Sequence, residues 1–129
     1  MTTKVNTKGP RMQAFIDNAT MSVPREWGDG SIMEIIKQII EMIMPFIMGC
    51  FPMGSRFAKA RFINTCQRMG RFRQDQIAGF CKQAAPKVDG LPREEEAGAA
   101  DCAADCIIST LPSMSDDDLA ALFDELYSA

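Results

Sequence analysis

The chain has 129 residues, of which 47% are hydrophobic and 24% charged, and its formal net charge at pH 7 is −3. This composition is that of one globular domain with its own core, and it excludes a disordered chain. The absence of histidine excludes Ser-His and Cys-His nucleophilic catalysis and every histidine-containing zinc site.

Charge is distributed unevenly along the chain. Residues 56–87 contain eight basic side chains and one acid, whereas residues 88–129 contain eleven acids and one arginine. Such an asymmetry indicates either a charged partner or the docking of the two halves on each other.

Residues 1–30 show no helical or strand periodicity beyond a single turn at 12–16, and prolines and a Gly-Asp-Gly turn signal interrupt them. We predict an extended arm over this range. Because the arm carries Trp27, the chain's only tryptophan, we expect it to lie on its own core or on a neighbouring subunit.

A strongly apolar helix is predicted to begin at Ile32. Ser31 and Glu34 fit the capping box, in which each side chain accepts from the other residue's backbone amide. Isoleucine and methionine then cover about two thirds of the helix circumference. Pro45 lacks a backbone donor, so we expect the helix to stop near Met44 or to kink there.

Two amphipathic helices are predicted next, over residues 55–69 and 73–85. Gly70 is a typical residue after a helix end, and Pro86 cannot continue the second helix. The first of these helices and the start of the second carry most of the basic side chains.

The acidic third of the chain contains two further predicted helices. Pro92 followed by three glutamates is typical of a first helical turn, and this helix should extend to about Thr110. Ser115 followed by three aspartates predicts the cap and first turn of a last helix over residues 116–127.

The sequence therefore predicts an all-α fold, a small bundle of four to five helices with an extended N-terminal arm. Residues 1–30 are the arm, 31–90 an apolar and basic helical core, and 91–129 an acidic C-terminal helical hairpin. No β-alternating segment and no internal repeat is present.

The segment IIEMIMPFIMGCFPM, residues 39–53, admits three interpretations. A membrane span needs about 20 apolar residues, but the charge-free run over 42–55 has only 14. Sulfur ligands of this kind select Cu(I), but soft ligands alone do not define a site, so neither a metal nor another cofactor is predicted. Packing inside a core or an interface is favoured, because methionine fills irregular apolar space. The sulfur-bearing residues are Met42, Met44, Met48, Cys50 and Met53.

The five cysteines also admit a structural interpretation. Their odd number and the lack of a signal-peptide layout at the N-terminus predict reduced thiols and a cytoplasmic or virion-associated protein. Cys102 and Cys106 lie one helical turn apart, but zinc sites usually repeat such a pair, so buried free thiols are favoured.

The basic segment 56–73 interleaves arginine with phenylalanine, which is typical of a surface that contacts phosphate and stacks on bases. The alternative is a solvated face whose aromatic rings point inward. The acidity of the whole chain disfavours a dedicated nucleic-acid binder. The candidate nucleic-acid contacts are Arg56, Lys59, Arg61, Arg68, Arg71 and Arg73.

Two apolar stripes are candidates for partner binding, one on the isoleucine-rich helix and one on the terminal helix. Amphipathic helices of this pattern lie in grooves of partner proteins, but the same pattern closes a protein's own bundle. The candidate partner-binding residues are Trp27, Ile35, Ile36, Ile39, Ile43, Leu119, Leu122, Phe123 and Leu126.

No motif predicts catalysis or a small-molecule substrate, since the acidic clusters sit where helix N-termini favour negative charge. We therefore expect a non-enzymatic interaction or assembly protein, an adaptor or a structural subunit of cellular or viral origin, with a protein partner or a second copy of itself. The alternative function is a nucleic-acid-binding regulator whose acidic tail is autoinhibitory. A second alternative, association with a membrane surface, is disfavoured.

Overall fold

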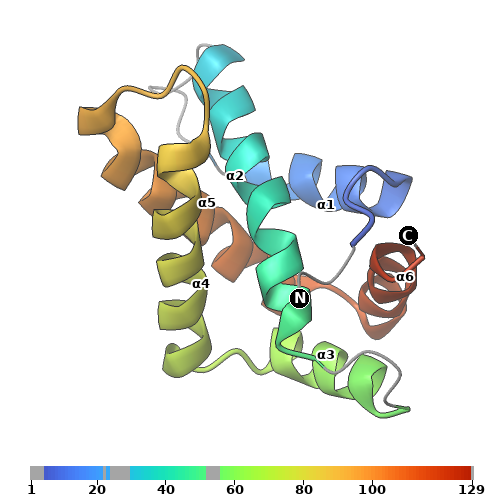
Figure 1. The fold of residues 1–129 in the computed structure, drawn as a ribbon. Coiled ribbons are helices and arrows are strands. Elements are labelled where there is room, and N and C mark those ends of the chain that lie inside the picture. The colour runs from blue at the N-terminus through green and yellow to red at the C-terminus, as the bar shows by residue number, and fades with distance from the viewer. Residues whose placement is uncertain (1–4, 22, 24–29, 52–55, 129) are drawn as a thin grey trace.

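A computed structural model describes residues 5–21, 23, 30–51 and 56–128, with the side chains of residues 30 and 31 excepted. Within these ranges the chain forms six α-helices and three short 3₁₀ helices, and no strand (Figure 1). The all-α prediction is confirmed, with six helices where four to five were expected. The α-helices are α1 (Pro10–Thr20), α2 (Gly30–Gly49), α3 (Ala58–Gln67), α4 (Arg71–Ala84), α5 (Glu96–Thr110) and α6 (Asp116–Leu126).

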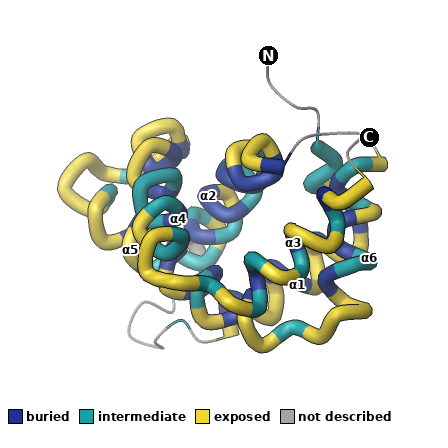
Figure 2. Tube along the Cα trace, turned by 90° about the horizontal axis from the view of Figure 1, so that it is seen from below, coloured by how far each residue is buried: buried dark blue, intermediate teal, exposed yellow. Residues whose placement is uncertain are grey.

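Helix α2 runs through the middle of the bundle. It packs against α4 and α5 on one side and against α1 on the other, while α3 and α6 pair with each other (Figure 1). Four of its isoleucines, Ile36, Ile39, Ile40 and Ile43, are fully buried in the described core, and its buried positions lie in the interior in Figure 2. Much of the apolar circumference predicted for this helix is therefore covered by the chain itself, while Ile32 and Ile35 are half-buried.

The N-terminal arm is shorter than predicted. Of the residues described before α1, 5–9 are non-helical, and Pro10 occupies the first turn of α1, which extends to Thr20. Met12, Phe15 and Ile16 bury their side chains in the core. The arm was expected to lie on its own core or on a neighbour, and this part of it lies on its own core.

Helix α2 does not stop near Met44; it continues through Pro45 to Gly49. The last turn is held by burial of Ile47 and Met48. The Tyr127 hydroxyl lies 3.1 Å from the carbonyl oxygens of both Met48 and Phe51, and donates to one of them at a time. These tertiary contacts offset the hydrogen bond that the proline cannot make.

The remaining helices lie close to their predicted positions. Helix α3 is shorter than the predicted 55–69, and α4 begins two residues earlier than predicted. A 3₁₀ turn at Arg93–Glu95 leads into α5. At α6 the Ser115 hydroxyl accepts from the backbone amide of Asp118 at 3.1 Å, so the predicted cap is confirmed.

Candidate interaction surface

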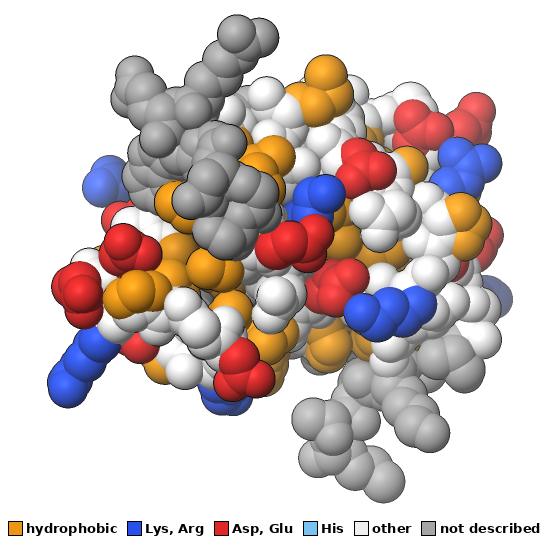
Figure 3. Space-filling model, turned by 90° about the horizontal axis from the view of Figure 1, so that it is seen from above, with side chains coloured by type: hydrophobic (Ala, Val, Ile, Leu, Met, Phe, Trp, Pro, Cys, Tyr) orange, Lys and Arg blue, Asp and Glu red, His pale blue; other side chains and the backbone are white. Residues whose placement is uncertain are grey.

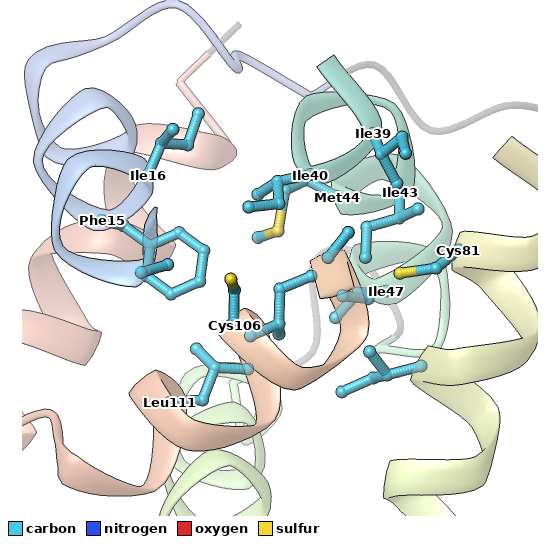
Figure 4. Close-up of a cluster of buried hydrophobic side chains, with 14 of the residues drawn as sticks. Phe15, Ile16, Ile39, Ile40, Ile43, Met44, Ile47, Cys81, Cys106 and Leu111 are labelled. Carbon is cyan, nitrogen blue, oxygen red and sulfur yellow. The ribbon is translucent and has the colours of Figure 1, made fainter. Parts of the chain in front are cut away.

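Most of the predicted partner-binding residues lie in the core of the same chain. The isoleucines on the inner side of α2, among them Ile39 and Ile43, point into the cluster shown in Figure 4. The stripe of α6 is buried likewise, while Ile35 is half-buried and Trp27 lies outside the described residues. In this structure the apolar stripe of the terminal helix closes its own bundle. The fully buried members are Ile36, Ile39, Ile43, Leu119, Leu122 and Leu126, and Phe123 is nearly so.

The basic segment 56–73 is joined to the acidic C-terminal region by a small number of contacts. Lys59 Nζ lies 2.8 Å from Asp124 Oδ1, and this is the only ion pair between the two regions within the described ranges. The Gln67 amide donates to the Asp116 carboxylate and to the carbonyl oxygen of Met114. The docking of the two halves on each other therefore uses one of the six predicted cations.

Four of the other cations form, with two aromatic rings, an exposed surface along α3 and at the start of α4, while Arg73 is half-buried and donates to the Gln76 side chain. Phe57 is 63% exposed and Phe72 is 75% exposed. On α3 the exposed positions 57, 61, 64 and 68 recur every three or four residues, so they share the face turned away from buried Phe62. We call this the Arg/Phe surface, and define it as Arg56, Phe57, Arg61, Arg68, Arg71 and Phe72.

Arginine lies beside both exposed rings. The guanidinium carbon of Arg56 is 5.4 Å from the centroid of Phe57, and that of Arg73 is 5.9 Å from the centroid of Phe72. Single exposed aromatic side chains are ordinary on protein surfaces. Two such rings among arginines, however, have the composition of interaction surfaces, in which aromatic residues and arginine are enriched and lysine is depleted.

A second surface feature lies at the other end of the bundle, between the first turns of α2 and α5. It is a groove of about 390 Å³, with half-buried Ile32, Ile35 and Leu91 and buried Ala99 on its floor and Glu94 and Glu95 at its rim. Figure 3 looks onto this end and shows acidic side chains next to apolar ones. We call it the α2/α5 groove and define it as Ile32, Ile35, Leu91, Glu94, Glu95, Gly98 and Ala99.

The interior space between α2, α3 and α4 is too small for a ligand. A cavity of about 30 Å³ lies between α2, α3 and α4, lined by Cys50, Cys66 and Arg73 among others. This volume is on the order of a single water molecule. Nothing about it indicates a substrate site.

The copper interpretation of segment 39–53 has no geometric support among the described residues. Met44 and Met48 are fully buried in the apolar core, whereas Cys50 is exposed at the end of α2. Within the described ranges no three histidine, cysteine, aspartate or glutamate side chains are grouped so as to hold a metal ion. None of the helices described there is long and apolar enough to cross a bilayer.

Burial controls the chemistry of the free thiols. It raises the pKa of Cys66 and of Cys81 to about 12, and it also raises that of Cys102. Cys50, by contrast, is exposed. The thiolate is the reacting form, and for a pKa near 12 its fraction at pH 8 is about a thousandfold smaller than for an ordinary thiol.

We therefore expect one thiol, that of Cys50, to react rapidly with a disulfide reagent at pH 8. Cys66 and Cys81 should react only as fast as the bundle opens, because they are both buried and protonated. Stopped-flow absorbance with peptide mass spectrometry measures the rates, and Cys50→Ser should remove the rapid phase. Labelling of Cys66 or Cys81 at the rate of Cys50 would contradict the described packing.

Comparison with known proteins identifies no relative: no protein-family model, no curated protein and no solved structure matches the chain. The functional argument therefore depends on the residues of this chain alone. The two surface features that distinguish it are the Arg/Phe surface, whose cations the sequence predicted, and the α2/α5 groove, which it did not.

Proposed function

We propose that this chain is a non-enzymatic interaction or assembly protein, an adaptor or structural subunit, that contacts its partner through the Arg/Phe surface. The observation that carries the proposal is the exposure of Phe57 and Phe72 among arginines. The location proposed for it, inside a cell or a virion, is supported by its free cysteines, since thiols persist in reducing compartments.

We assign partner binding to the Arg/Phe surface and no longer to the apolar stripes of α2 and α6. The stripes of α2 and α6 are already used in folding, and releasing either would expose core residues to water at a cost of about 25 cal/mol per Å². The Arg/Phe surface needs no such release. Its guanidinium groups offer bidentate hydrogen bonds to carboxylates, and its rings offer apolar area.

Self-association provides the direct test. We expect the mass from light scattering to rise above the monomer value of 14.3 kDa between about 5 µM and about 500 µM. The double variant Phe57→Ser, Phe72→Ser should weaken association about 1,000-fold, because aromatic anchors typically contribute about 2 kcal/mol or more each.

A matched control is available on a different part of the molecule. Met21 is 82% exposed at the end of α1 and does not belong to the Arg/Phe surface, so Met21→Ser should associate like the wild type. A wild-type protein that stays monomeric throughout the range, or a double variant that associates as tightly as the wild type, would refute the proposal of an assembly role for this surface.

The second candidate function is nucleic-acid binding by the same surface, as the sequence suggested. It is supported by the lack of any acid between residues 56 and 74, and by exposed rings on which bases can stack. Deleting residues 112–129 is not a suitable test, because α6 contributes buried leucines to the core. Salt-dependent retention of the intact chain on single-stranded DNA, lost in Arg68→Glu and Arg71→Glu, would favour this candidate.

A further inference from the structure

We infer that the Arg/Phe surface of one copy docks in the α2/α5 groove of a second copy. In this contact Phe72 enters the groove, and the flanking Arg71 and Arg73 meet the rim carboxylates Glu94 and Glu95. The inference rests on the proposed function and adds to it the identity of the partner and the receiving site.

The groove has the size and lining that a side-chain anchor needs. Its volume of about 390 Å³ lies within the range of about 300 to 1,000 Å³ over which clefts bury apolar ligands. Three branched aliphatic side chains, Ile32, Ile35 and Leu91, are only half-buried there although they pack against the core. An aromatic ring placed on them would remove apolar area of both copies from water.

Charge complements this apolar fit. Glu94 and Glu95 are exposed and form no ion pair with any described residue, although four other ion pairs are present within the described ranges. Phe72 has arginines as its two chain neighbours, one of which lies over its ring. An apolar anchor flanked by cations is complementary to an apolar floor beside two carboxylates.

The two surfaces lie at opposite ends of the bundle. Helix α4 begins at Arg71, at the lower end in Figure 1, and ends near the starts of α2 and α5 at the upper end. Its 14 residues span about 21 Å at 1.5 Å per residue. Since one copy cannot bring its own surfaces together, the contact joins the Arg/Phe surface of one copy to the groove of another. Repeated head-to-tail, such contacts form rings or chains; made reciprocally by two antiparallel copies, they close a two-fold dimer.

A second copy explains more of the structure than a nucleic acid does. A nucleic acid would contact the Arg/Phe surface only, and its phosphates would be repelled by the glutamates of the groove. A second copy uses both surfaces and their opposite charges. It also accounts for strong local charge on a chain whose net charge is small.

Two variants that each lose one surface test the inference. The first, Arg71→Glu with Phe72→Ser, keeps the groove; the second, Glu94→Arg with Glu95→Arg, keeps the Arg/Phe surface. Each alone should remain at 14.3 kDa by light scattering, where the wild type forms larger species. A 1:1 mixture should give a dimer of about 29 kDa and nothing larger, because only one complementary pair of surfaces remains intact.

A matched charge control lies on α5. Asp101 and Asp105 are exposed acids outside the groove, so Asp101→Arg with Asp105→Arg should assemble like the wild type. Far-UV circular dichroism and thermal unfolding of every variant establish that each is folded. Loss of assembly in the folded control variant would show that net charge, not the groove, governs the contact, and would overturn the inference.

The remaining outcomes separate this inference from the proposed function. If the groove variant assembles like the wild type, or if the mixture stays monomeric, the groove assignment fails, and the Arg/Phe surface keeps its role with another binding site on the partner.

Residues 24–29, which join α2 at Gly30 and lie outside the described residues, are the other available occupant of the groove. A shift in Trp27 fluorescence in the groove variant with unchanged assembly would assign the groove to them and overturn the inference. A wild-type chain that is monomeric at every concentration overturns both proposals, and retention on single-stranded DNA would then favour the nucleic-acid candidate.

Discussion

Replacing Phe62 by alanine is expected to lower the free energy of unfolding by about 3 to 5 kcal/mol. The Phe62 side chain is fully buried on α3, and its ring centroid lies 5.6 Å from that of Phe51 and 5.4 Å from that of Phe123. Truncation removes these contacts and leaves a cavity between α3, α6 and the end of α2. Because domains of this kind are stable by only about 5 to 15 kcal/mol, the loss is a large share of the total.

Urea unfolding followed by far-UV circular dichroism measures this effect, and Phe72→Ala provides the matched control. Phe72 carries the same side chain on the next helix but is 75% exposed, so its truncation should change the free energy of unfolding by no more than about 0.5 kcal/mol. Equal losses for the two variants would show that the aromatic cluster around Phe62 is not a packed core.

The features that the sequence predicted well are those with local causes. The all-α class follows from apolar spacings of three and four, and the start of α6 follows from Ser115; Pro92 marks the 3₁₀ turn at Arg93–Glu95, so α5 itself begins four residues later than predicted. Each of these signals acts within one helical turn of the residue that carries it. A reader of the sequence can therefore place such helices without knowing what they pack against.

Of the two outcomes predicted at Pro45, a stop near Met44 or a kink, the stop is wrong, and the contacts that decide this are distant in sequence. Locally, proline is a signal to stop. Tyr127, which donates a hydrogen bond to the carbonyl oxygen of Met48 in the last turn of α2 or to that of Phe51 just after it, comes from the opposite end of the chain. Burial of Ile47 and Met48 is equally a property of the bundle.

The candidate surface was predictable only in part. The sequence identified the six cations of 56–73, but it could not decide whether the phenylalanines among them point inward. Phe62 does, since it shares a helix face with buried Ala58 and Cys66. Phe57, which precedes the first residue of α3, and Phe72, the second residue of α4, do not. The α2/α5 groove was not predictable, because Ile32 and Leu91 meet only through the packing of α2 against α5.

Helix α1 was missed for a similar reason. Gly9 precedes it and offers no side-chain cap, so the local sequence carries Pro10 as a start signal but no capping side chain. The carboxylate of Glu125 on α6 takes that role, accepting from the backbone amides of Arg11 at 2.9 Å and Met12 at 2.7 Å. A cap supplied from the far end of the chain leaves no pattern near the helix that it starts.

This arrangement predicts that Glu125→Ala lowers the free energy of unfolding by about 2 to 3 kcal/mol, because two charge-assisted hydrogen bonds at the positive end of a helix dipole are lost together. Glu125→Gln keeps one carbonyl acceptor and should lose roughly half as much. Asp124→Ala removes a neighbouring acid that pairs only with partly exposed Lys59, and should cost less than about 1 kcal/mol. Urea unfolding of the three variants measures these differences.

The same cap makes Gly9 sensitive to substitution. The backbone of Gly9 is extended, at φ −77° and ψ 166°, so alanine is not excluded by conformation. A Cβ atom there would instead overlap the side-chain end of Glu125 and displace the carboxylate from its amides. Gly9→Ala should therefore cost about 1 to 2 kcal/mol in the wild type but less than about 0.5 kcal/mol beside Glu125→Ala, a coupling that a double-mutant cycle resolves. Equal costs in both backgrounds would mean that the α6 carboxylate does not hold the start of α1.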